Sequence, residues 1–143
     1  MLRYSWPVTI RRAPADVFPY VADTAKQALY SDVPMRLLTP GLLRTGSRME
    51  VTFGMGPIKA VIGLELTAVE ENKRMAFDTY SGSIRWQGEY VLTPTDDGGT
   101  SLSHSGTMVF TGLWRLLEPL VGAELKLNGA KEMGRMKTVI EGG

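Results

Sequence analysis

The sequence predicts an α+β fold in which a curved antiparallel β-sheet wraps around one long C-terminal α-helix, with two short helices after the first strand. Two observations lead to this prediction. A short strand near the N-terminus runs into a helix that starts at Pro14, and a long helical segment closes the chain. Between these ends, from about residue 35 to residue 110, apolar and polar side chains alternate as they do in strands. A curved sheet closed by a helix encloses a cavity, so the pattern indicates a protein that holds an apolar molecule.

Length and composition narrow the class of protein. We expect residues 1–143 to form one domain, long enough to bury its own core. Sixteen basic side chains against fifteen acidic ones argue against a nucleic-acid partner. The absence of cysteine excludes disulfides, thiolate metal sites and cysteine nucleophiles, and it suits a cytoplasmic protein. No apolar run approaches the roughly 20 residues of a membrane span, so we expect no integral membrane association. Nothing in the sequence calls for a cofactor or a metal ion.

The first thirty residues predict one strand and two helices. Residues 4–10 alternate apolar and polar side chains, which places four apolar groups on one face of a strand. Pro7 suits a strand at the edge of a sheet. Pro14 then opens a helix that runs to about residue 23, and a second short helix follows to about Tyr30.

The middle of the chain predicts the rest of the sheet. Turn signals separate six further strands, predicted over residues 35–38, 47–53, 58–69, 75–79, 84–93 and 100–110. The predicted strand over 58–69 is long, which favours a strongly bent sheet. The Gly54–Pro57 sequence joins two strands, and we expect it to form a hairpin tip at the mouth of the cavity. Asp97, Gly98 and Gly99 are a strong turn signal before the last strand.

The C-terminal segment carries both a break signal and a helical pattern. Pro119 would remove a helical hydrogen bond, so we expect a break near Glu118 and two helical pieces. Beyond it, polar residues at spacings of three and four form one solvated stripe: Glu124, Asn128, Lys131, Arg135 and Thr138. The opposite arc is expected to be buried and contains Gly122, Leu125, Gly129, Met133, Met136 and Ile140, flanked by Ala123, Leu127 and Ala130.

Several diffuse motifs connect the chain with a known superfamily. They are the strand-to-helix opening over Ile10–Phe18, Gly98-Gly99-Thr100 before the last strand, Phe110-Thr111-Gly112 after it, and Met136-Lys137 with Glu141 near the end. On these motifs the chain resembles the START-like helix-grip (SRPBCC) superfamily, and within it the polyketide cyclase/dehydrase and lipid-transport family. The resemblance covers nearly the whole chain and implies a helix-grip fold. Tyr30 stands where many members carry Trp.

The resemblance specifies architecture better than activity. Members of the superfamily include ligand carriers, cyclases, chaperone co-factors and ribosome-associated toxins, and a fold does not determine a function. Three readings of this chain therefore stay open. We favour a carrier or sensor of a hydrophobic or amphipathic small molecule. A homodimer is compatible with this reading. The first alternative is a polyketide cyclase/dehydratase-like enzyme, and the second is a protein-interaction module that uses the outer surface.

Side chains on the inner faces of the predicted strands and helix are the candidate ligand-binding residues. They are Leu64, Phe77, Trp86, Tyr90, His104, Met108, Phe110, Leu125, Gly129, Met133 and Met136. Trp86 and Tyr90 share one face, where they either meet a ligand oxygen or fill the core. Gly129 either makes room for the ligand or lets the helix approach a strand closely.

His104 is the sharpest chemical candidate because the parity of its strand points it inward. It has three readings: a general base for cyclisation or dehydration, a group that orients a polar part of the ligand, or a hydrogen-bonded structural residue. A general base needs an orienting acceptor, and only Ser and Thr are its polar neighbours along the strand. We therefore expect no catalytic residue and assign His104 to ligand binding.

Overall fold

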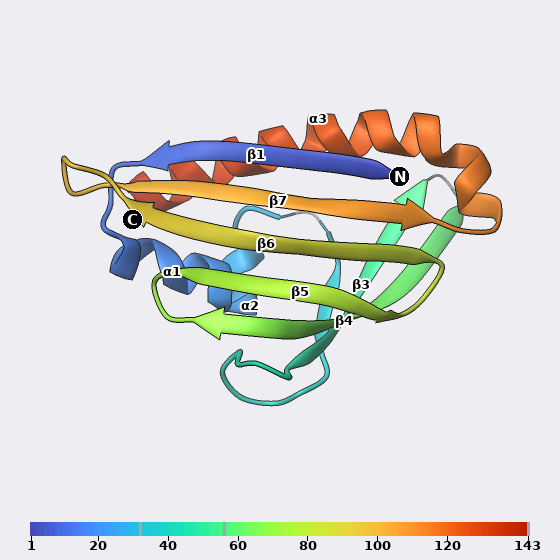
Figure 1. Ribbon diagram of the computed structural model, residues 1–143, viewed down its shortest axis with the longest axis horizontal. Helices are drawn as coiled ribbons and strands as arrows, with labels where there is room; N and C mark the ends of the chain where they lie inside the picture. Colours follow the sequence, from blue (N-terminus) through green and yellow to red (C-terminus); the bar gives the residue numbers. More distant parts are fainter. Residues whose placement is uncertain (32, 56, 143) are drawn as a thin grey trace.

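The computed structural model describes residues 1–31, 33–55 and 57–142. Seven antiparallel strands form one sheet in the order β1-β7-β6-β5-β4-β3-β2, with β1 and β2 at its edges (Figure 1). The strands are β1 Leu2–Ile10, β2 Met35–Leu37, β3 Arg48–Met55, β4 Ile58–Glu70, β5 Arg74–Ser81, β6 Ile84–Pro94 and β7 Thr100–Phe110. The helices are α1 Pro14–Ala22, α2 Thr24–Gln27 and α3 Leu113–Gly142. The predicted α+β helix-grip architecture is confirmed.

The sheet bends where β4 pairs with β5. The register between these strands shifts twice, between Gly63 and Leu64 and between Leu66 and Ala68. Such bulges bend a strand and increase its twist. The thirteen residues of β4 are thus long enough to follow the curve, and the inner face of the sheet becomes concave toward α3.

The opening of the chain follows simple helix rules. Pro14 occupies the first turn of α1, where a missing backbone N–H costs little. The inner side of this helix is buried and contains Val17, Phe18 and Val21. Asp23 ends α1 and caps α2, since its carboxylate accepts a hydrogen bond of 2.9 Å from the backbone N–H of Ala25.

The long helix α3 is continuous, so the predicted break near Glu118 is wrong. Pro119 removes one helical hydrogen bond, but Trp114 before it and Val121 after it are both buried in the core. Packing on both sides holds the helix together, and the proline bends it instead of ending it. Figure 1 shows the first turns of α3 running in a different direction from the rest.

The polar stripe and the centre of the buried arc of α3 lie as predicted. The flanks of that arc do not, because Ala123, Leu127 and Ala130 are exposed. Leu127 keeps 57% of its surface in solvent. The helix therefore buries a narrower face than its composition suggested, and α3 rests against β1 and β7 without being surrounded by the sheet.

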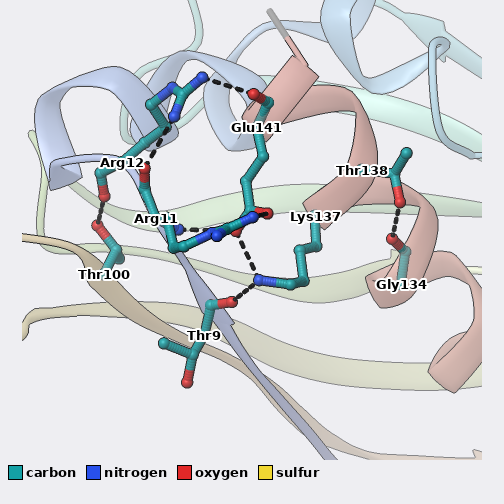
Figure 2. A network of polar contacts seen from close by, with 8 residues as sticks. All are labelled: Thr9, Arg11, Arg12, Thr100, Gly134, Lys137, Thr138 and Glu141. Atoms are coloured by element: carbon teal, nitrogen blue, oxygen red, sulfur yellow. Dashed lines mark hydrogen bonds and ion pairs between the residues drawn. The ribbon is translucent and has the colours of Figure 1, made fainter.

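A polar network fixes the C-terminal end of α3 to the corner between β1 and α1 (Figure 2). The Glu141 carboxylate accepts hydrogen bonds from the backbone N–H of Arg11 at 2.8 Å and from Lys137 Nζ at 2.5 Å. These two bonds lower the pKa of Glu141 to about 2. The Arg12 guanidinium also donates to the Glu141 carbonyl at 2.5 Å. The far end of the helix is thus held against the start of the chain.

Candidate ligand cavity

A cavity of about 350 Å³ lies between α3 and the concave face of the sheet. All seven strands, α3, the end of α2 and the segment after it contribute to its walls, which are mostly apolar. Eight of the predicted ligand-binding residues line it: Leu64, Phe77, Trp86, Tyr90, His104, Met108, Leu125 and Gly129. A space of this size suits a small organic molecule.

Three of the predicted ligand-binding residues are not among those that line the cavity. Phe110 is the last residue of β7, pairs with Ile84, and fills the core where the chain turns into α3. Met133 and Met136 lie on later turns of α3, which approach the corner fixed by Glu141, and both are buried in the core. They face inward as their spacing predicted, but they pack against core side chains, whereas Glu132 and Arg135 on the same turns of α3 border the cavity.

The polar centre of the cavity is the hydroxyl group of Tyr4. Trp86 Nε1 donates a hydrogen bond to it at 2.6 Å, and the hydroxyl lies 3.0 Å from His104 Nε2. An indole N–H can only donate, so the Tyr4 oxygen is the acceptor of the first bond. The hydroxyl proton is buried and needs an acceptor of its own, and His104 Nε2 provides it within the described residues. A chain of hydrogen bonds thus runs from Trp86 through Tyr4 to His104.

Two glycines make room for the Tyr4 side chain. Gly106 of β7 pairs with Tyr4 of β1 on one side and with Gly88 of β6 on the other. A Cβ atom at Gly106 or Gly88 would lie 2.7 or 2.8 Å from the Tyr4 hydroxyl oxygen, closer than carbon and oxygen can pack. The glycine pair therefore lets the tyrosine ring reach over β7 and place its hydroxyl beside Trp86 and His104.

The His104 ring is enclosed by aromatic side chains and is only 4% exposed. Tyr90 stacks on it with ring centroids 4.1 Å apart, and Trp6 approaches by its edge at 5.4 Å. Burial lowers the pKa of His104 to about 3. The imidazole is therefore neutral at physiological pH, and its Nε2 atom is already occupied by Tyr4.

Gly129 explains how α3 comes so close to the first strand. A Cβ atom at this position would lie 2.1 Å from the Trp6 indole ring. Of the two readings of Gly129, close contact between helix and strand is the one that the geometry supports. Gly122, one heptad earlier, is under no such constraint, since the nearest atom to a Cβ there is a Leu2 methyl group at 3.6 Å.

Several polar residues of the cavity were not predicted from the sequence. Glu132 of α3 lines the wall, and its negative charge adds to the effect of burial in raising the pKa values of Tyr4, Tyr30 and Tyr90. Arg135 also borders the cavity and donates a hydrogen bond of 2.9 Å to the Tyr30 carbonyl. The sequence could have indicated the position of Glu132, because this residue lies one heptad after the cavity residue Leu125 and therefore on the same side of the helix.

The predicted solvated stripe of α3 borders the same space. Glu124, Asn128 and Arg135 are exposed residues that also line the cavity, so its rim on the helix side is polar. Gly54 lines the cavity on the side of β3. The predicted hairpin tip over Gly54–Pro57 includes Gly56, which lies outside the described residues.

Two classes of site find no support in the described ranges. No cluster of three or more His, Asp or Glu side chains there is placed to hold a metal ion. No helix among those residues has both the length and the hydrophobicity needed to cross a lipid bilayer.

Comparisons with solved structures show many similar folds. Protein TTHA0849 from Thermus thermophilus superposes with a TM-score of 0.79 at 17% identity, over 96% of each chain. The Zhui aromatase/cyclase from Streptomyces sp. R1128 gives a TM-score of 0.75 at 12% identity, over 97% of this chain and 93% of the other. Ara h 8.0201 gives 0.71 at 14% identity, over 99% and 98%. At these identities the likeness concerns the fold alone.

Sequence comparison identifies the family more directly. No curated protein matches this chain significantly in sequence. The family model described as polyketide cyclase / dehydrase and lipid transport matches residues 1–141, which is almost the entire chain. With the helix-grip fold around an internal cavity, this match shows that the chain belongs to the polyketide cyclase/dehydrase and lipid transport family.

Proposed function

We propose that this protein binds a hydrophobic or amphipathic small molecule in the cavity between the sheet and α3, as a carrier or sensor. The observation that supports this proposal is the cavity itself, about 350 Å³ of space with mostly apolar walls and one buried polar cluster. Removal of apolar ligand surface from water drives binding in such a site, while a few polar groups set the orientation.

The polar groups are distributed in a way that suits an amphipathic ligand. Tyr4, Trp86 and His104 form one cluster among buried aromatic rings, whereas Glu124 and Asn128 lie on the exposed rim. A molecule with an apolar body would occupy the space between these two regions. Its water-soluble end would lie at the rim, where charge costs little to solvate.

The geometry supports binding over the cyclase alternative. A general base needs a free acceptor atom and a pKa near the working pH. In His104 the Nε2 atom accepts from Tyr4, and burial holds the pKa at about 3. Burial is the cause of that shift, and in the described part of the chain no carboxylate is hydrogen-bonded to the ring.

A matched pair of substitutions on α3 tests the proposal. Leu125 lines the cavity, whereas Leu127, two residues later, is exposed. Leu125→Trp fills part of the cavity and should weaken binding of the neutral fluorescent probe N-phenyl-1-naphthylamine by about tenfold or more, equivalent to about 1.4 kcal/mol. Leu127→Trp adds the same ring outside the cavity and should bind like the wild type. Equal binding by all three proteins, or no binding by any, would contradict the proposal.

A further inference from the structure

We propose that the ligand carries an uncharged hydrogen-bond acceptor, such as a carbonyl oxygen, which accepts the Nδ1–H of His104 inside the cavity. This inference rests on the proposed function and adds the chemical class of the ligand. It follows from counting the protons in the buried chain from Trp86 to His104.

The tautomer of His104 is set by its neighbours. Trp86 uses the Tyr4 oxygen as acceptor, and the Tyr4 proton is then directed to His104 Nε2. A neutral imidazole carries one proton, and with Nε2 acting as acceptor this proton must be on Nδ1. Tyr4 is held in place by the close approach over Gly88 and Gly106, so the arrangement is built into the sheet.

The Nδ1–H group is left for a ligand. His104 lines the cavity, and no hydrogen bond to Nδ1 is formed by the residues that the structure describes. Nδ1 is not among the fully enclosed side-chain atoms that lack a partner in the described residues, so this atom is open to the cavity. A donor that faces a mostly apolar cavity gains a hydrogen bond when a ligand brings an acceptor. A ligand acceptor at this atom would satisfy it.

The surroundings favour an uncharged acceptor. Tyr90 and Phe77 pack their rings around His104, and an anion among them would lose its hydration. The negative charge of Glu132 raises the pKa values of Tyr4 and Tyr90, the two tyrosines beside His104, and it would oppose a carboxylate beside these rings. Arg135, the cation that borders the cavity, lies at the exposed rim and is bonded to the Tyr30 carbonyl. A ketone, ester or amide carbonyl meets both conditions.

A pair of probes with one skeleton tests the inference. 9-Fluorenone and fluorene share a fused-ring frame and differ by a carbonyl group in place of a methylene group. The wild-type protein should bind fluorenone about three- to tenfold more tightly than fluorene, the ratio expected for one net hydrogen bond. The infrared carbonyl stretch of bound fluorenone should shift to lower wavenumber than in an alkane solvent.

Variants assign the effect to His104. His104→Leu should bind the two probes equally, whereas Ser105→Ala, one residue further along β7, should keep the preference for fluorenone. Equal binding of the two probes by the wild type would overturn this inference and leave the proposed function standing. Binding of neither probe would contradict the proposed function and the inference together.

The tautomer can be measured without any substitution. The chain contains one histidine, so the two ring-nitrogen signals of a ¹⁵N-histidine-labelled sample belong to His104 alone. We expect a protonated Nδ1 and an unprotonated Nε2 at pH 7. A proton on Nε2 would overturn the inference even if the His104→Leu protein did not fold.

Discussion

Gly129→Ala is the substitution whose cost the structure predicts most clearly. The added methyl group would lie 2.1 to 2.4 Å from three carbon atoms of the Trp6 ring. That ring cannot turn aside freely, because it stacks on Tyr4 with centroids 4.3 Å apart and has His104 at its edge. The clash is relieved only if the indole ring moves toward the cavity or α3 moves away from β1.

The magnitude comes from two opposing terms. Alanine stabilises a helix by about 1 kcal/mol relative to glycine. Overpacking of a well-filled site typically costs about 1 to 3 kcal/mol. Gly134→Ala provides the matched control, since Gly134 lies in the same helix and a Cβ there has no atom within 4 Å. Both variants gain the same helix propensity from alanine, so the difference between them is the cost of overpacking. The Gly129→Ala protein should therefore be about 1 to 3 kcal/mol less stable than the Gly134→Ala protein.

Urea unfolding of the two variants and the wild type measures this difference. We expect Gly134→Ala to raise the unfolding midpoint, and Gly129→Ala to be about 0 to 2 kcal/mol less stable than the wild type, with unchanged slopes. In the Trp6→Leu background the Gly129→Ala penalty should largely disappear, because the atoms that clash are gone. If the two alanine variants are equally stable in the wild-type background, the close contact between α3 and β1 is not as described.

Three further predictions concern charge and the helix backbone. The pKa of His104 falls from 6.5 to about 3 on folding, so at acidic pH the unfolded chain binds more protons than the folded one. The free energy of unfolding should therefore fall by about 2 kcal/mol as the pH is lowered from 7 to 5. In the His104→Leu protein this pH dependence should be absent. Pro119→Ala should raise the urea midpoint, because it restores the hydrogen bond to the Arg115 carbonyl at an exposed position; an unchanged or lower midpoint would contradict this. Glu141→Gln should lower the melting temperature at pH 7 more than Glu124→Gln does, since the bonds to Glu141 act above pH 4.5 and are lost as pH falls through about 2. Equal melting temperatures for the two glutamine variants would count against the network of Figure 2.

Periodicity predicted most of the architecture because it reports which face of each element is buried. The alternation along β6 and β7 placed Trp86, Tyr90 and His104 on the inner face, and all three line the cavity. Periodicity does not report which residues of a helix turn border a cavity and which pack in the core. For this reason Met133 and Met136 of α3 were assigned to the cavity, although they pack in the core while Glu132 and Arg135 of the same turns line the cavity.

Contacts between distant parts of the chain could not be predicted in the same way. The bond between Tyr4 and His104 joins residues 100 positions apart, and it depends on the register of β1 against β7. A sequence shows which residues face inward but not which of them meet across strands. The continuity of α3 through Pro119 likewise depends on tertiary packing, which overrides the local preference of proline.

The most direct test of ligand binding in the cavity is a crystal structure of the protein grown with 9-fluorenone. We expect electron density for the probe between α3 and the sheet, in contact with Leu125, with its carbonyl oxygen within hydrogen-bond distance of His104 Nδ1. Density for the probe only on the outer surface, or a cavity without probe density at saturating probe concentration, would contradict ligand binding at this site.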